Sequence, residues 1–562
     1  MSISKNISRR KFCHTSGLAG LAMTIPLVSS GCASLESKKR TFKTLEEKTY
    51  NPRLIANEDG FTFLYHSGDD LGANDLKTYL SRWKDTNVDM VAYCVAFGGF
   101  VTFYQSSIAD PIGTGYKTSE KIEQNRWLRN RERLVREAGD YIGLVFSFLK
   151  EMGIAPVASF RMNDIHLSED PAGPLAGSFW KKNPQWRIGS SYYLDYAVPE
   201  VRDYLRQLIN EVIHKFPDVA GIELDGMRTP VLFENGKGQE LAPLLTELIR
   251  QIRTDLDAAS LAQGKPRYVL RVNVPRSPEL ALKCGMDVAT WDAEKLVDSI
   301  SPGCYGTDFQ IPIERWKAFL SQRTLVHAYF NSGRISSQYH SLEEYRGAAA
   351  NAYATGADGV YLFNLPCFDE MAALLLRPID QPTFPPPQFN AQCWHPDLSR
   401  SQQALYELDD PNNIQRKNKK FLFYTDQMHE LHYAPEQADI QRENPQPTDL
   451  HFRCYEDYSR VKEIRIEIKT VSVSIFDQFS FSLNNQPIPS SCVKRLHAPG
   501  GRDRRIHATV LEPYSQYIIQ LTSQKKLMQP DENLLTVTLV KQDPDVLGKI
   551  ELREMELFVN YC

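Results

Sequence analysis

The fold of this chain is decided by one stretch of sequence, Ala220-Gly221-Ile222-Glu223-Leu224-Asp225-Gly226-Met227-Arg228. Apolar residues flank two carboxylates that lie two positions apart, a pattern typical of a buried strand that ends in charge. Side chains alternate along a strand, so Glu223 and Asp225 point to the same side. Burial and like charge make such a pair costly to ionise, which favours a site that uses the carboxylates. The alternative is a structural acid pair that Arg228 or another cation neutralises.

Outward from this stretch, apolar runs alternate with amphipathic helices. Eight runs are predicted as strands: residues 61–65, 90–97, 155–160, 219–224, 268–274, 300–305, 324–330 and 359–363. Apolar residues at helical spacing predict helices over residues 198–216, 241–256 and 342–355. This alternation implies a parallel sheet covered by helices, and eight repeats predict a closed (β/α)8 barrel, the TIM barrel. A doubly wound sheet is the alternative, but no Gly-rich phosphate-binding fingerprint follows the first predicted strand.

The pattern changes in a Pro-rich stretch near residue 384. Short alternating runs separated by turn signals then predict an antiparallel β-sandwich, with strands at residues 463–468, 471–475, 479–483, 518–521, 534–539 and 550–559. We therefore predict a signal at residues 1–32, a tether at 33–58, the barrel at 59–384, and a linker with the sandwich at 385–562. Scattered aromatic residues favour a sandwich that braces the barrel over one that binds carbohydrate.

The N-terminus has the features of a targeting segment. Ser8-Arg9-Arg10-Lys11-Phe12 resembles a twin-arginine export signal and precedes an apolar stretch too short to span a membrane. Val28-Ser29-Ser30-Gly31-Cys32 resembles a lipoprotein processing site in which Cys32 is acylated, although Ser29 stands where such sites usually carry Leu. We expect export to the periplasm, or a membrane-anchored lipoprotein that faces the periplasm or the cell exterior.

Composition narrows the classes of partner. The formal net charge is −4, and nothing in the charge pattern indicates a nucleic-acid partner. No apolar run after residue 40 reaches the roughly 20 residues that a membrane span needs. The cysteines form no C-x-x-C motif and the twelve histidines no H-x-x-x-H motif, so the sequence predicts neither a metal site nor a cofactor. No feature of the sequence sets an oligomeric state.

Polar residues recur where the predicted strands end. In a barrel these ends converge on the C-terminal face, where active sites lie. The residues are Tyr65, His66, Asp69 and Asp70; Arg161, Asn163, Asp164 and His166; Glu223, Asp225 and Arg228; Arg271 and Asn273; Tyr305 and Asp308; His327, Tyr329 and Asn331; and Asn364. Together they predict a polar substrate-binding site, although each of them could instead be a core polar group, His327 above all.

Such a site suits the cleavage of glycosidic bonds. That chemistry needs a protonated carboxylic acid and an ionised carboxylate that serves as nucleophile or base. We expect Asp225 to be the charged carboxylate. Asp308 ranks above Glu223 as the general acid, because neighbouring side chains on one strand lie too close to flank a bond from opposite sides; Asp164 and Asp70 are further candidates. Glu223 would then tune Asp225 or hold a sugar hydroxyl.

Two long insertions follow the second and third predicted strands. Residues 98–136 and 167–195 are rich in aromatic side chains: Phe100, Phe103, Tyr104, Tyr116 and Trp127 in the first, and Phe179, Trp180, Trp186, Tyr192 and Tyr193 in the second. Both would rise from the C-terminal face of a barrel. Aromatic planes stack on the apolar faces of sugar rings, which favours a carbohydrate substrate. The alternative is that these aromatic residues only pack the insertions.

Four motifs resemble the glycosyl hydrolase-like barrel proteins of environmental bacteria, close to the family 10 glycosyl hydrolase-like group. They are Ile222-Glu223-Leu224-Asp225-Gly226-Met227-Arg228, Phe160-Arg161-Met162-Asn163-Asp164-Ile165-His166, Asp195-Tyr196-Ala197-Val198-Pro199-Glu200-Val201-Arg202, and Gly285-Met286-Asp287-Val288-Ala289-Thr290-Trp291 followed by Leu296-Val297-Asp298. The resemblance covers residues 60 to 370 and implies a (β/α)8 barrel that hydrolyses O-glycosyl bonds.

One departure bears on the catalytic pair. Glycosidases with paired glutamates need a Glu on strand seven, where this chain has His327-Ala328-Tyr329-Phe330-Asn331. The arrangement is more similar to barrels with aspartates on strands four and six, as in α-galactosidase-type enzymes. That similarity favours Asp225 with Asp308.

Two other readings stay open. His66-Ser67-Gly68-Asp69-Asp70 suggests a metal-dependent polysaccharide deacetylase, although paired histidines are missing. A non-catalytic carbohydrate-binding lipoprotein that kept the barrel and lost the chemistry is the second, because fold does not fix function.

Overall fold

A computed structural model describes most of the chain after residue 42. The described residues are 43–66, 71–97, 100–115, 122–164, 166, 170–303, 310–331, 341–365, 402–424, 438–498, 501–503, 509–511 and 513–561. The predicted export signal with Cys32 lies outside them, and so do the predicted site residues Asp70, Tyr305 and Asp308.

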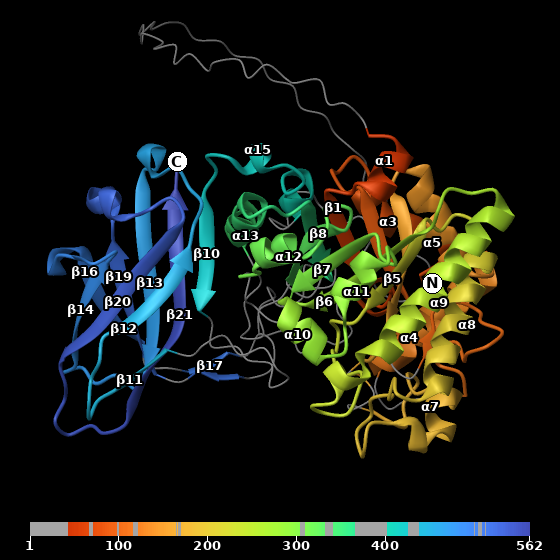
Figure 1. Cartoon of the computed structure of the whole chain (residues 1–562), viewed down its shortest axis with the longest axis horizontal. Coiled ribbons are helices and arrows are strands. Elements are labelled where there is room, and N and C mark those ends of the chain that lie inside the picture. Colours follow the sequence, from red (N-terminus) through yellow and green to blue (C-terminus); the bar gives the residue numbers. More distant parts are fainter. Residues whose placement is uncertain are drawn as a thin grey trace, which may run out of the picture. The chain divides into compact units, whose positions relative to one another are not determined.

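Eight parallel strands close into a barrel (Figure 1). Neighbours pair in the order β1, β2, β4, β5, β6, β7, β8 and β9, and β9 pairs with β1 again. The strands are β1 Leu54–Glu58, β2 Met90–Phe97, β4 Ala155–Arg161, β5 Gly221–Asp225, β6 Val269–Pro275, β7 Ser299–Gly303, β8 Leu325–Asn331 and β9 Gly359–Phe363; the short β3, Val101–Thr102, pairs antiparallel with β2. The predicted (β/α)8 barrel is confirmed.

Helices cover the outside of the barrel (Figure 1). They are α1 Leu45–Tyr50, α2 Thr62–His66, α3 Ala73–Leu80, α4 Ile122–Ala138, α5 Tyr141–Glu151, α7 Ser178–Lys182, α8 Pro199–Lys215, α9 Gly238–Gln263, α10 Pro278–Lys283, α11 Val288–Ala293, α12 Ile313–Phe319 and α13 Leu342–Ala354, with the 3-10 turns η1 Ser81–Trp83 and η2 Pro184–Trp186. The three helices predicted from apolar spacing are α8, α9 and α13. In α8 the buried residues are those of the predicted apolar face, Val201, Leu205, Leu208, Ile209, Val212 and Ile213.

The first strand was predicted wrongly. Residues 62–66 form helix α2, and the first strand is β1, which lies inside the stretch predicted as a tether. The Asp59 carboxylate accepts the backbone N–H groups of Phe61 and Thr62 and the hydroxyl of Thr62, and such side-chain bonds to the backbone favour a helix start over a strand. Gly60 has a positive φ of 79°, which turns the chain between β1 and α2. Tyr65 and His66 therefore belong to a helix and do not end a strand.

The second domain consists of antiparallel sheets, as predicted. One sheet has the strand order β10-β21-β13-β19-β16 with β11 added to β21, another has the order β12-β20-β14-β15, and β17 pairs with β18. The strands are β10 Lys419–Tyr424, β11 Ala438–Gln441, β12 Thr448–Arg453, β13 Glu463–Val471, β14 Gln478–Leu483, β15 Gln486–Pro487, β16 Val493–Ala498, β17 Gly501–Asp503, β18 Thr509–Leu511, β19 Tyr514–Gln520, β20 Glu532–Lys541 and β21 Lys549–Asn560. The arrangement is that of a β-sandwich.

Details of the sandwich differ from the prediction. No separate strand forms at residues 471–475, because β13 ends at Val471 and a loop follows. Between the domains run the 3-10 turn η4 Gln402–Tyr406 and the short helix α15 Pro411–Ile414, and within the sandwich lie the 3-10 turns η5 Tyr458–Arg460, η6 Ser490–Cys492 and η7 Thr522–Leu527. Strand β10 packs on the barrel helix α13, where Lys420 pairs with Glu344 across 3.0 Å.

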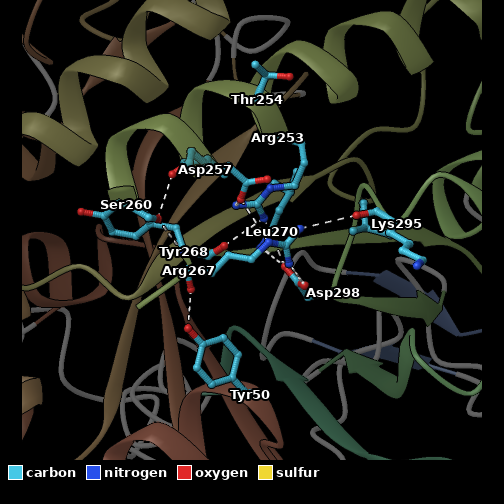
Figure 2. A network of polar contacts seen from close by, with 12 residues as sticks. Tyr50, Arg253, Thr254, Asp257, Ser260, Arg267, Tyr268, Leu270, Lys295 and Asp298 are labelled. Atoms are coloured by element: carbon cyan, nitrogen blue, oxygen red, sulfur yellow. Dashed lines mark hydrogen bonds and ion pairs between the residues drawn. The ribbon is translucent and has the colours of Figure 1, made fainter. Parts of the chain in front are cut away.

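A polar network joins the N-terminal ends of two barrel strands to helices α1 and α9 (Figure 2). Asp298, just before β7, pairs with Arg253 and Arg267 and accepts the backbone N–H of Leu270 at 2.8 Å. The hydroxyl of Tyr50 donates to the carbonyl of Arg267 at 2.5 Å. Because parallel strands share one direction, this network lies at the end of the barrel opposite the C-terminal face.

Strand β5 lies so close to β6 that its first residue has no room for a side chain. A Cβ on Gly221 would lie 2.4 Å from the backbone oxygen of Val269 and 2.2 Å from its Cγ2. Backbone cannot yield cheaply, so a methyl group there would push the two strands apart. Gly143, in the first turn of α5, is a matched control because its nearest contact would be an ordinary 3.5 Å.

We expect Gly221→Ala to lower the free energy of unfolding by about 1–3 kcal/mol, the usual cost of overpacking a core. Gly143→Ala should leave it unchanged or raise it by up to about 1 kcal/mol, since Ala is the better helix former. Denaturant unfolding curves of the two variants and the wild type measure the difference. Equal behaviour of the two variants would show that the β5–β6 contact is not tight.

Candidate active site

A row of polar side chains crosses four neighbouring strands near their C-terminal ends. The strand register aligns Arg161 of β4 with Asp225 of β5, Asp225 with Asn273 of β6, and Asn273 with Ser301 of β7. All four residues are buried. Residues that alternate along a strand share a face, and the same register places a second polar row two residues deeper, made of Ser159, Glu223, Arg271 and Ser299. The interior of the barrel is therefore unusually polar.

Asp225 stands at the end of β5 with one oxygen satisfied and one open. Its Oδ1 accepts the backbone N–H groups of Met227 at 3.0 Å and Arg228 at 3.2 Å, and the side-chain N–H of Asn273 at 3.4 Å. Its Oδ2 is buried and has no hydrogen-bond partner among the described residues. An unpaired buried carboxylate oxygen lowers the stability of the folded protein. Its presence here therefore indicates that the oxygen has a functional role.

Burial raises the pKa of Asp225, and nearby groups oppose that rise in part. The charge of Arg161 lowers the pKa most, followed by the backbone N–H of Met227, the Asn273 amide and the charge of Arg228. The net direction is upward, so the carboxylate becomes charged at a higher pH than an ordinary aspartic acid. The surrounding donors decide how far that shift goes.

Asp164, at the same face, is held in its charged form. Its Oδ2 lies 3.2 Å from Nη1 of Arg161 and 3.7 Å from Nε of Arg228, and its Oδ1 accepts the backbone N–H of His166. Although burial raises its pKa, His166, Arg228 and Arg161 together hold the pKa of Asp164 well below the usual range. A group that stays ionised cannot supply a proton, so Asp164 does not fit the role of general acid.

His166 bridges this carboxylate and Arg228. Its Nδ1 lies in hydrogen-bond contact with Asp164, and its Nε2 lies 3.4 Å from Nη2 of Arg228. Because a guanidinium can only donate, Nε2 must accept, which leaves the ring proton on Nδ1 facing the carboxylate. The predicted site residues Arg161, His166 and Arg228 therefore come together with Asp164 in one charged cluster.

Glu223 lies deeper in the barrel and is enclosed by partners. Its Oε1 accepts the hydroxyls of Ser159 and Tyr361, both at 2.8 Å, and its Oε2 forms an ion pair with Nε of Arg271 across 2.9 Å. Burial raises its pKa, while Arg271 lowers it. Tyr361 in turn accepts an N–H from Asn273, which also donates to Asp225. The contacts suit a supporting role toward Asp225 and leave Glu223 poorly placed to reach a substrate.

Asn163 uses its amide to hold two loops together. Its Nδ2 donates to the carbonyls of Leu194 at 3.0 Å and Val231 at 2.6 Å, and its Oδ1 accepts the N–H of Leu194 at 3.1 Å. Both amide hydrogens are thus spent on the backbone. Asn163 therefore positions the loops after β4 and β5, and a direct contact with substrate stays a prediction.

Three further predicted residues lie in different places. Asn364, just after β9 with a positive φ of 49°, accepts an N–H of Arg161 at 3.5 Å and so lies at the C-terminal face. Tyr329 is stacked inside the barrel against Tyr361 and Phe363. His327 donates from Nε2 to the carbonyl of Pro52 at 2.9 Å, near the start of β8, and burial with the charge of Arg271 lowers its pKa to about 3. His327 is therefore a core residue far down the strand and is not brought to the face.

Because the first strand was predicted at the wrong place, the sequence-based prediction missed one residue of the site, Asp59. It follows β1 and is buried, and although burial opposes it, the charge of Arg161 and the hydrogen bonds from Thr62 and Phe61 lower its pKa below the usual value. Its neighbour Glu58 accepts the hydroxyl of Tyr79, from α3, at 2.8 Å, and burial with the charge of Asp59 raises its pKa to about 7. The signal in the sequence was the run Asn57-Glu58-Asp59-Gly60, which ends a short apolar segment.

Most aromatic residues of the two insertions pack against one another. Phe100, Phe103, Tyr104, Trp127 and Trp180 are buried. Phe179 stacks on Tyr204 of α8 with ring centroids 3.8 Å apart and also contacts Trp186. Tyr193 is half-buried and lines a cavity, and Tyr192 is exposed, whereas Tyr116 lies outside the described residues. Of the described aromatic side chains predicted to bind a sugar, most are thus engaged in packing, and few are left to contact a ligand.

Among the described residues, no group of three or more His, Cys, Asp or Glu side chains is placed to hold a metal ion. No described helix is both long enough and apolar enough to cross a membrane.

Comparisons with known proteins give no family. No family model matches the sequence, and no curated protein matches it. Among solved structures, an alpha-L-fucosidase GH29 from Bacteroides thetaiotaomicron is 10% identical with a TM-score of 0.35, over 91% of this chain and 95% of that chain. A GH18 chitinase from Pseudoalteromonas aurantia is 8% identical with a TM-score of 0.32, over 56% of this chain and 94% of that one. A chitinase from Chromobacterium violaceum is 11% identical with a TM-score of 0.31, over 58% and 99%. Similarities this low carry no conclusion about function.

Removal of one partner of the buried pair Glu223–Arg271 tests whether Glu223 is structural. We expect Arg271→Met to lower the free energy of unfolding by about 3–5 kcal/mol, because it leaves a buried charge without a partner. The double variant Arg271→Met with Glu223→Gln should recover part of that loss, since it removes both charges. Denaturant unfolding of the single and double variants measures the coupling. A double variant no more stable than Arg271→Met would contradict it.

Proposed function

We propose that the C-terminal face of the barrel is the active site of a glycoside hydrolase, in which Asp225 is the charged catalytic carboxylate. The observation that carries the proposal is the open oxygen of Asp225. It is buried, it ends a strand at the face where barrel enzymes hold their catalytic groups, and it lies among cationic and amide donors. Carboxylates in such surroundings stabilise or attack the positively charged sugar carbon of an oxocarbenium-like transition state.

The surrounding residues divide the remaining work. Arg161, Arg228 and Asp164 form a fixed charged frame beside Asp225, and donors of this kind suit sugar hydroxyls. Asn273 and the backbone N–H groups of Met227 and Arg228 hold Oδ1, which leaves Oδ2 to face the substrate. Preorganised donors cost no rearrangement when charge develops, which is their main catalytic value.

We propose Asp308 as the general acid. Two rival carboxylates are engaged elsewhere: Glu223 with Arg271, and Asp164 with Arg161 and His166. Asp308 follows β7, two strands from β5, and lies outside the described residues. Its place in the sequence favours a position across the barrel mouth, which an acid needs to protonate the leaving oxygen from the other side of the bond.

The place of action is proposed from the sequence. The twin-arginine-like segment and Cys32 support export and a lipid anchor, so we expect the substrate to be a carbohydrate polymer or its fragments outside the cytoplasm.

The central prediction concerns Asp225→Asn. It should lower the release of reducing sugar by about a thousandfold or more, because the neutral amide cannot act as nucleophile or base. Binding of the same polysaccharide and the thermal unfolding midpoint should change little, since Asn keeps the size of Asp. The assay uses bacterial, plant and algal polysaccharides, with and without chelator.

Its outcomes separate the alternatives. Activity that chelator abolishes would replace the proposal by a metal-dependent deacetylase or hydrolase. A wild-type protein that binds a polymer and never cleaves it would indicate a carbohydrate-binding lipoprotein. Full activity in Asp225→Asn would remove Asp225 from the mechanism.

The pH dependence offers an independent test. The Asn273 amide lowers the pKa of Asp225, so Asn273→Ala should raise that pKa further. If the charged form is the active one, kcat/KM falls as the pH drops through this pKa, and the acid limb should move to higher pH in the variant. Ser301→Ala removes a hydrogen bond to Arg271 from the same row without touching Asp225, so its acid limb should stay in place. A shift to lower pH in Asn273→Ala would contradict the assignment.

A further inference from the structure

A cavity of about 780 Å³ lies among the loops that follow β4, β5 and β6. Its walls come from Ile188 and Tyr193 after β4, from residues 230–239 after β5, and from Leu280 and Lys283 of α10 after β6. This volume falls in the range of roughly 300–1,000 Å³ that is usual for small-molecule sites. Among the described residues, Asp225 and its partners Arg161, Asp164 and Arg228 do not line it, so it is a separate feature of the same face.

The cavity adjoins the charged cluster around Asp225. Asn163, beside Asp164 at the end of β4, bonds to Leu194, the neighbour of the lining residue Tyr193, and to the lining residue Val231. Burial raises the pKa of the Tyr193 hydroxyl, and the charge of Asp164 raises it further. A ligand that fills the cavity therefore reaches toward the site.

The walls are firmly built. Residues 186–195 form a tight hairpin, in which Arg187 and Leu194 make an antiparallel bridge and the N–H of Ile188 donates to the carbonyl of Tyr193 at 2.9 Å. On the opposite wall, Phe233 packs so closely on Gly285 that a Cβ there would lie 2.4 Å from the ring. A preformed cavity binds without the cost of ordering its walls.

The lining has the mixed character that sugar rings require. Tyr193, Phe233 and Ile188 offer apolar and aromatic surface, while Glu234, Gln239 and Lys283 bring exposed polar groups. A pyranose presents an apolar face that stacks on an aromatic ring and hydroxyls that both donate and accept. One acidic and one basic side chain balance each other, which favours a neutral ligand over a strongly charged one.

We propose that this cavity is a second sugar-binding subsite, which holds further units of the same carbohydrate chain whose scissile bond lies at Asp225. The protein then prefers chains of several sugars over disaccharides. This inference rests on the proposed function for the position of the bond, although binding in the cavity does not itself require cleavage.

The experiment measures binding apart from turnover. Oligosaccharides of two to six units from β-glucan, xylan, mannan and chitin are titrated calorimetrically into the full-length Asp225→Asn protein. We expect affinity to rise with length in at least one series. Adding Tyr193→Ala should weaken binding of the longer members by about tenfold, the equivalent of one lost aromatic stacking contact, and leave the disaccharide unchanged.

Matched variants guard against a folding defect. Tyr192→Ala changes the adjacent, more exposed tyrosine, which does not line the cavity, and should leave binding unchanged. Gln239→Leu and Lys283→Met alter exposed residues that do line it and should also weaken only the longer chains. The thermal midpoints of all variants are compared.

The outcomes distinguish the two proposals. Affinity that is independent of length, no binding in any series, or equal losses in the Tyr192 and Tyr193 variants would overturn the subsite. Length-dependent binding through Tyr193 without any hydrolysis by the wild type would keep the subsite and overturn the proposed glycosidase. Hydrolysis by the wild type, with unchanged binding in the Tyr193, Gln239 and Lys283 variants, would keep the proposed glycosidase and overturn the subsite.

Discussion

The interior of this barrel depends on the ion pair between Glu223 and Arg271. Two charges removed from water are costly, and the cost is met only where further hydrogen bonds complete the pair. Here Ser159 and Tyr361 complete the carboxylate, and Ser301 accepts from the guanidinium at 2.5 Å. These partners come from β4, β9 and β7, so the pair ties together five of the eight strands. A barrel packed with aliphatic layers would need no such network.

Arg161 plays the corresponding part at the C-terminal face. Its charge lowers the pKa of Asp59, Asp164 and Asp225, which come from the ends of β1, β4 and β5. The three carboxylates nevertheless differ because their other partners differ. Asp59 is bonded to the start of α2, and Asp164 is held by Arg228 and His166. Asp225 is held by Met227, Arg228 and Asn273 through Oδ1, and its buried Oδ2 has no hydrogen-bond partner among the described residues.

In the loops above this face, most aromatic side chains pack into the core and few face the cavity. The described aromatic residues of the first insertion pack into the core, and Phe179 does the same through its stacking on Tyr204. Tyr193 instead lines the cavity, on the hairpin at residues 186–195 that backbone bonds close. The same composition that suggests a sugar platform therefore serves mostly to stiffen the loops, and a small remainder faces the cavity.

The barrel could be predicted from local pattern, because seven of the eight predicted strands and the helices between them follow from periodicities within short segments. The sequence by itself also determined the shared face of Glu223 and Asp225, since alternation along a strand needs no tertiary information. It could not assign β1, where a side-chain cap at Asp59 outweighed the strand-like run of residues 61–65. It ranked Asp225 above Glu223 as the charged carboxylate, but it could not show the partners of either one, and it listed Asn163 as a substrate-binding residue. Those roles depend on which partners distant strands bring: Arg271 and Tyr361 close around Glu223, and Leu194 and Val231 occupy Asn163. Contacts between residues 31 to 138 positions apart leave no trace in a local pattern, so the partners of Glu223, Asp225 and Asn163 could be identified only in the folded chain.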